Sequence, residues 1–158
     1  MVMQLDDSLS TIRIVDGNDV LLTDSLRQNK LFKDGYEYEA CSSQALMIET
    51  LCSMYMGLQS QAYQIPILDQ KGRDVAGKPK ATFGRVVNLL VSNNAFHTKS
   101  IGVKLELYVA LRNKLAHEIS GTSSHFNFVD FFDLGKEIAE TLKPYFLDTM
   151  NKIKCQPQ

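Results

Sequence analysis

The stretch from Tyr36 to about Gln64 constrains the fold more than any other part of this 158-residue chain. Apolar residues recur in it at steps near three and four, which is the spacing of an α-helix. One stripe holds Ala40, Met47, Leu51, Tyr55, Leu58 and Ala62, and a second holds Cys41, Ala45, Ile48 and Cys52. Two apolar stripes on one helix imply neighbours on more than one side. We therefore expect this helix at the centre of a helical bundle.

Four further segments have helical periodicity, and no segment sustains the period of two that marks a strand. They run from Asp19 to about Gln28, from Phe83 to about Ser92, from about Lys99 to Ile119, and from about Asn127 onward. Thr82 is a plausible cap for the second of them. Pro144 lies inside the last and should kink or split it, because proline removes a backbone hydrogen bond. The sequence predicts an all-α, up-and-down bundle of about five helices, with residues 1–158 forming one domain.

Length, charge and cysteine usage exclude several classes of protein. A chain of this length can bury a core without disulfides or metals. Its formal net charge of −1 is too small for the whole molecule to attract nucleic acid non-specifically. Any contact with RNA is therefore expected to be local. Cys41, Cys52 and Cys155 lack the spacing of a zinc site, and reduced cytoplasmic thiols are expected, with no metal and no cofactor. Residues 1–7 lack the basic-then-apolar pattern of a secretory leader, and no apolar run approaches the roughly 20 residues of a membrane span, so we expect neither secretion nor a membrane partner.

A loop follows the long helix and is interrupted by Pro66, Gly72, Gly77 and Pro79. It contains a Gly-Lys pair, but Pro79 stands where a Walker phosphate loop needs Ser or Thr, and no strand precedes it. Four basic residues against two acidic ones give it a small positive excess. A solvated loop is the favoured interpretation, and a loop that helps to grip an RNA backbone is the alternative.

The segment from Leu111 to His117 contains the residues best suited to chemistry. Counted at about 100° per residue, Arg112 falls in the middle of its helix's apolar stripe, whereas Asn113 and His117 are expected together at the edge of that stripe. A guanidinium directed at an apolar face needs a paired anion or an interface groove, because an unpaired buried charge is costly. Arg112 could thus be a structural residue paired with a carboxylate, and His117 could be a helix-terminal residue that favours the dipole.

The alternative is that these residues act together on a phosphodiester. Arginine offers a rigid fork of donors for phosphate oxygens, and histidine can exchange a proton at neutral pH. RNA supplies its own nucleophile, the 2′-hydroxyl, so a base and a cation suffice for cleavage without a metal. Asn113 lies one turn before His117 and could orient the imidazole or bind the phosphate. Because such a ribonuclease needs both an acid and a base, we expect a homodimer whose twofold axis brings two sets of residues into one cleft.

The segment Arg112–His117 (RNKLAH) resembles the Arg-x4-6-His motif of HEPN domains, the higher eukaryotes and prokaryotes nucleotide-binding superfamily. The segment Thr82–Leu90 also resembles the Thr-hydrophobic-Gly helix that precedes the motif in several bacterial members. The resemblance implies a helical bundle, usually a homodimer, and in many members a metal-independent endoribonuclease of toxin–antitoxin, phage-defence or CRISPR-linked systems.

By this resemblance, the catalytic residues would be Arg112 and His117 at the two named positions of the motif, supported by Asn113. RNA would be the substrate, and an antitoxin or other regulatory protein would be a further partner. Ile119 stands where toxins paired with nucleotidyltransferase antitoxins have a tyrosine, which argues against regulation through modification of that residue. Some HEPN domains are inactive, so a non-catalytic helical interaction or regulatory module is the alternative function. A small-molecule or nucleotide-binding bundle is a third.

Overall fold

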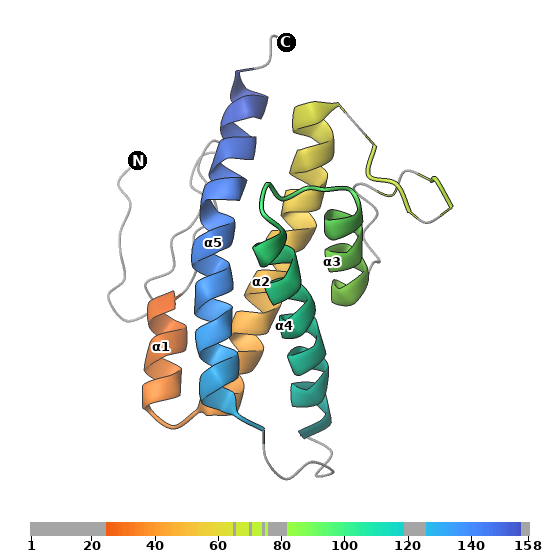
Figure 1. Cartoon of the computed structure of the whole chain (residues 1–158). Helices are drawn as coiled ribbons and strands as arrows, with labels where there is room; N and C mark the ends of the chain where they lie inside the picture. Colours follow the sequence, from red (N-terminus) through yellow and green to blue (C-terminus); the bar gives the residue numbers. More distant parts are fainter. Residues whose placement is uncertain are drawn as a thin grey trace.

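The computed structural model describes residues 25–64, 66–69, 71–73, 75, 82–118 and 126–155, and this part of the chain is an all-α bundle (Figure 1). Its helices are α1 (Ser25–Lys33), α2 (Glu37–Tyr63), α3 (Phe83–Ser92), α4 (Lys99–Glu118) and α5 (Phe128–Lys154). The predicted all-α class is confirmed. Within the described ranges, no helix is long and apolar enough to cross a membrane.

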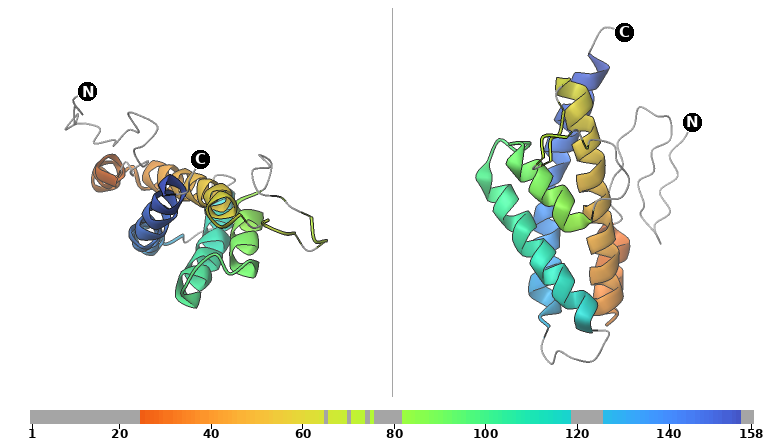
Figure 2. Two further views of the ribbon diagram at one scale, coloured as in Figure 1. Left: turned by 90° about the horizontal axis from the view of Figure 1, so that it is seen from above. Right: turned by 90° about the vertical axis from the view of Figure 1, so that its right-hand side faces the viewer.

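Helices α2 and α5 run in the same direction along the centre of the bundle. Their contacts follow the same order along both helices: Gln44 Nε2 donates to the carbonyl of Phe132 (2.9 Å), and Gln59 Nε2 donates to Thr149 Oγ1 (2.9 Å). Helix α4 runs the opposite way beside them, whereas α1 and α3 lie at opposite edges of the bundle (Figures 1 and 2). Because α2 packs against α1, α3 and α5, it is the central member that its two apolar stripes predicted.

Periodicity located most helix bounds correctly. The bounds of α2 and α3 lie within one residue of those expected, and α4 begins at Lys99 as expected. The predicted end of the first helix near Gln28 is wrong, because α1 continues to Lys33, where Leu31 and Phe32 still pack against the core. Gly35 then turns the chain with a φ of +88°, a conformation that favours glycine. The expected start of that helix at Asp19 lies outside the described residues, as does Ile119.

Helix α5 passes through Pro144 without a break, so the predicted split does not occur. The proline leaves the carbonyl of Glu140 without its usual helical donor. Both residues are exposed, and water can therefore satisfy that carbonyl. At its start α5 is capped by Asn127, whose side chain accepts a hydrogen bond from the backbone N–H of Asp130 (3.1 Å). In contrast, Thr82 occupies the N-cap of α3 without a capping hydrogen bond from its side chain.

A buried polar cluster ties α2, α4 and α5 together. Gln44 of α2 is 1% exposed, and its Oε1 accepts a hydrogen bond from Tyr108 Oη of α4 (3.1 Å) while its Nε2 binds the Phe132 carbonyl of α5. The Tyr108 ring stacks on Phe131 with 4.4 Å between the centroids. Gly135 lies directly against the Gln44 amide, where a β-carbon would have no room. This cluster fixes the relative positions of the three longest helices.

The thiols of Cys41 and Cys52 are expected to resist alkylation in the folded protein. Burial, with a smaller contribution from Glu37 or Glu49, raises the pKa of each thiol to about 12, whereas Cys155 is exposed. Because the thiolate is the reactive form, iodoacetamide at pH 8 should add one adduct, at Cys155, as measured by mass spectrometry. In denaturant all three thiols should react. Rapid native modification of Cys41 or Cys52 would contradict this prediction.

Candidate active site

Arg112 lies on the bundle-facing side of α4, one turn after the buried Tyr108 and beside the buried Leu115. Helical side chains lean toward the N-terminus of their helix, and the Arg112 guanidinium extends to α2, where Nη2 lies 3.4 Å from Glu49 Oε2. The Arg112 side chain is 41% exposed and that of Glu49 is 27% exposed. Arg112 therefore has a paired anion, one of the two alternatives expected from its sequence position, and it also borders a groove.

The groove lies between α2 and α4 and has a volume of about 240 Å³. It is lined by Tyr38, Ser42, Ala45, Leu46, Glu49, Arg112, Leu115 and Ala116. The α2 members recur at helical spacing and the α4 members occupy consecutive turns, so two rigid helices hold the walls. Arg112 and Glu49 are its charged groups among the described residues, and Ser42 and Tyr38 add hydroxyls. An anion that displaced Glu49 would find one guanidinium and neutral donors beside it.

Asn113 and His117 do not line this groove. Both are exposed on α4, and five residues at about 100° each place His117 about 140° around the helix from Arg112. The expectation that these two residues lie at the edge of the apolar stripe is wrong, because both are exposed and lie about 100° and 140° around the helix from Arg112. Within one protomer, the structure thus brings Arg112 together with Glu49 and not with His117.

Glu49 is not among the site residues predicted from the sequence, although the pattern of α2 indicates it. Glu49 follows Ala45 by four residues and precedes Cys52 by three, so it interrupts an apolar stripe of α2. Arg112 interrupts the apolar stripe of α4 in the same way. Opposite charges in two core-facing stripes predict an ion pair between the helices that carry them. If Arg112 has the structural role that its sequence position allows, Glu49 is the carboxylate that pairs with it.

The other histidines show no comparable arrangement. His97 is exposed, with its ring 5.8 Å from the ring of Tyr145, and His125 lies outside the described residues. Within the described ranges, no three His, Cys, Asp or Glu side chains are grouped in a way that could hold a metal ion.

The chain matches no protein-family model, no curated protein and no solved structure. Its candidate site is therefore defined by the geometry around Arg112 and by the motif in the sequence.

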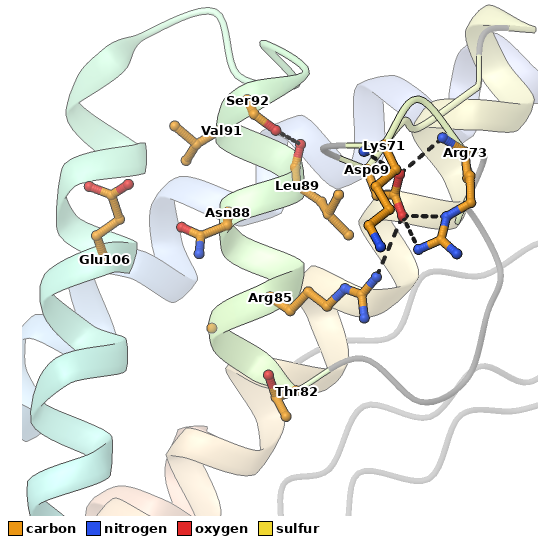
Figure 3. Close-up of a pocket in the computed structure, with 11 residues that line it drawn as sticks. Asp69, Lys71, Arg73, Thr82, Arg85, Asn88, Leu89, Val91, Ser92 and Glu106 are labelled. Carbon is orange, nitrogen blue, oxygen red and sulfur yellow. Dashed lines mark hydrogen bonds and ion pairs between the residues drawn. The ribbon is translucent and has the colours of Figure 1, made fainter.

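A second polar site lies beside α3, where Asp69 binds three basic residues (Figure 3). Its Oδ1 accepts the backbone N–H groups of Lys71 (2.8 Å) and Arg73 (3.0 Å). Its Oδ2 accepts Nε (2.9 Å) and Nη2 (2.7 Å) of Arg73, and Arg85 Nη2 lies 3.9 Å away. The Asp69 carboxylate is 7% exposed, whereas the Arg73 and Arg85 side chains are 63% and 52% exposed. One carboxylate therefore orients two guanidinium groups that remain open to solvent.

The Asp69 carboxyl is expected to titrate far into the acid range. Hydrogen bonds from the Arg73 backbone, and then from its guanidinium, lower the pKa of Asp69 from 3.8 to about 2. A group whose pKa is depressed by folding stabilises the fold above its unfolded pKa, so this contribution is present above about pH 4 and lost as the pH falls through 2. Carboxyl NMR should give a midpoint near 2. A midpoint at or above 3.8 would contradict the lowered pKa. Asp69→Asn should make the stability less dependent on pH between about 4 and 2.

Proposed function

We propose that the chain is a HEPN-type, metal-independent endoribonuclease that acts as a homodimer. The observation that carries the proposal is the placement of Arg112, whose side chain is 41% exposed in a groove and lies 3.4 Å from Glu49. A phosphate oxygen and a carboxylate oxygen accept hydrogen bonds from the same guanidinium donors. An RNA phosphodiester can therefore take the place of Glu49. The location we propose is the cytoplasm, where RNA substrates are found.

In this proposal, His117 is the general base or acid, and Arg112 stabilises the charge of the pentacovalent phosphorane. Base-assisted attack of the 2′-oxygen on phosphorus forms a 2′,3′-cyclic phosphate, and the departing 5′-oxygen takes up a proton. Asn113 supports the imidazole or the phosphate. Because Arg112 and His117 point about 140° apart around one helix, the proposal requires a dimer in which His117 of one protomer approaches the Arg112 groove of the other.

Cleavage of RNA in EDTA tests this function. Purified protein incubated with total RNA should give fragments that carry a 2′,3′-cyclic phosphate and a 5′-hydroxyl, identified by end-group mass spectrometry. A substrate with 2′-O-methyl ribose should resist, because it lacks the nucleophile. Failure of folded, dimeric protein to cleave any RNA would overturn the proposal, and so would products with free 3′-hydroxyl ends. If cleavage is found, toxicity on expression would support a role as a toxin or phage-defence effector controlled by an antitoxin.

A non-catalytic interaction or regulatory module is the second candidate. It is favoured by the Arg112–Glu49 ion pair, which already links α2 to α4, and by the orientation of His117 away from Arg112. If Arg112 only holds the two helices together, its removal should change stability by about 1 kcal/mol or less, as is usual for a half-exposed pair. In that case the folded wild-type protein should not cleave RNA.

A further inference from the structure

A second pocket lies away from Arg112, along α3, between the segment that follows α2 and helix α4. Its volume is about 800 Å³. The segment is anchored to the bundle, because Ile67 and Val75 are buried and the backbone N–H of Val75 donates to the Ile67 carbonyl (2.8 Å). The Asn93 side chain also binds both backbone groups of Leu68, at 3.2 and 3.1 Å. The pocket therefore has a defined wall on the side of this segment.

Basic side chains form that wall. Lys71, Arg73 and Arg85 line the pocket, and Asp69 holds the two guanidinium groups beside each other (Figure 3). Among the described side chains of this wall, three cations oppose one carboxylate and leave an excess of two positive charges. Arg73 uses two of its five N–H donors on Asp69, and guanidinium groups present further donors in a fixed plane. The wall suits a dianion with several oxygen acceptors.

The opposite side of the pocket has different chemistry. Glu106 of α4 and the side chains of Asn88 and Ser92 of α3 line it, and in Figure 3 helix α3 lies between Glu106 and the arginines. A carboxylate and an amide accept hydrogen bonds from hydroxyl or amino groups. The pocket thus fits a ligand with an anionic end and another end that carries hydrogen-bond donors. A volume of this size accommodates a ligand of nucleotide dimensions.

We propose that this pocket binds a phosphate monoester attached to a nucleoside, with the phosphate against Arg73, Arg85 and Lys71 and the nucleoside toward Asn88 and Glu106. The phosphate monoester carries the two negative charges that the basic wall balances, and its three terminal oxygens accept the guanidinium donors. The same group occurs on a free nucleotide and on the 5′ end of an RNA strand. The site is separate from Arg112, and its binding does not depend on ribonuclease activity.

Isothermal titration of the full chain tests the proposal with four probes. These are adenosine 5′-monophosphate, adenosine, and a short 2′-O-methyl oligoribonucleotide with or without a 5′-phosphate. Each phosphorylated probe that binds should bind at least tenfold more tightly than its unphosphorylated counterpart. Binding of the free nucleotide identifies it as a sufficient ligand, and binding of the phosphorylated oligonucleotide alone identifies an RNA end. Absence of binding by both phosphorylated probes at millimolar concentration overturns the proposal.

Substitutions assign the binding to this pocket. Arg85→Gln and Arg73→Gln should each lower the affinity for the phosphorylated probe at least tenfold. Lys136 is an exposed cation paired with Asp133 on α5, and Lys136→Gln should have no effect. Because Arg73 also orders its own turn, Arg85→Gln is the deciding variant. Arg112→Ala should leave the binding of adenosine 5′-monophosphate unchanged, which separates the pocket from the proposed catalytic site. Equal affinity of wild type and Arg85→Gln, with both folded by circular dichroism, overturns the assignment.

Discussion

Replacement of Gly135 by alanine is expected to lower the free energy of unfolding by about 3 kcal/mol or more. A β-carbon at this position would overlap the Oε1 and Cδ atoms of Gln44 and lie 2.9 Å from its Nε2. The Gln44 side chain is fully buried and bonded to the Phe132 carbonyl and to Tyr108 Oη. It can move only by giving up these two buried hydrogen bonds. Urea unfolding followed by circular dichroism measures the loss.

Gly57→Ala is the matched control, because Gly57 lies inside helix α2 and a β-carbon there meets no atom within 4 Å. Alanine is the better helix former, so this variant should be more stable than wild type by about 0.5–1 kcal/mol. The pair therefore predicts changes of opposite sign for the same substitution. Wild-type stability in Gly135→Ala would show that Gln44 has an alternative position.

A double substitution separates the overlap from the loss of hydrogen bonds. Gln44→Ala alone removes both hydrogen bonds of the Gln44 side chain and leaves a cavity beside Gly135. In the Gln44→Ala, Gly135→Ala protein the new methyl group occupies part of that cavity. The combined loss of stability should therefore be smaller than the sum of the two single losses, measured as a double-mutant cycle. Additive losses would mean that Gly135 and Gln44 act independently.

The sequence could predict the helices because each depends on its own pattern of apolar residues. The two apolar stripes of α2 predict its length and its central position without reference to any partner helix. The polar cluster could not be predicted in the same way. Gln44 lies in an apolar stretch of α2, but its partners, Tyr108 and Gly135, belong to helices more than sixty residues away. Only the parallel alignment of α2 with α5 brings Gln44 onto Gly135.

The candidate site shows the same limit. The position of Arg112 in the apolar stripe of α4 was sufficient to predict an anion or a groove, and both are present. The identity of the anion required the packing of α2 against that end of α4. The predicted position of His117 at the edge of the stripe is wrong, because five residues at about 100° each place it about 140° around α4 from Arg112. The dimer that would bring them together stays a prediction.

Arg112→Ala and His117→Ala are each expected to reduce RNA cleavage at least about a hundredfold, the usual effect of removing a general base or a charge-stabilising donor. Glu49→Gln should keep or increase cleavage, because it removes the carboxylate that competes with phosphate for Arg112. Lys114→Ala, an exposed cation on the same helix, is the control and should cleave like wild type. If Glu49→Gln loses as much cleavage as Arg112→Ala while remaining folded, the proposal that phosphate displaces Glu49 from Arg112 is wrong.

Mixing the two inactive variants tests whether the site is shared between protomers. A dimer that pairs an Arg112→Ala chain with a His117→Ala chain contains one site with an intact Arg112 from one protomer and an intact His117 from the other. Random exchange makes half of the dimers mixed, and half of their sites are intact, so about a quarter of wild-type cleavage should return if one such pair suffices. Cleavage measured before and after subunit exchange gives this fraction. No recovery after complete exchange would contradict a site that needs only one Arg112 and one His117 from different chains.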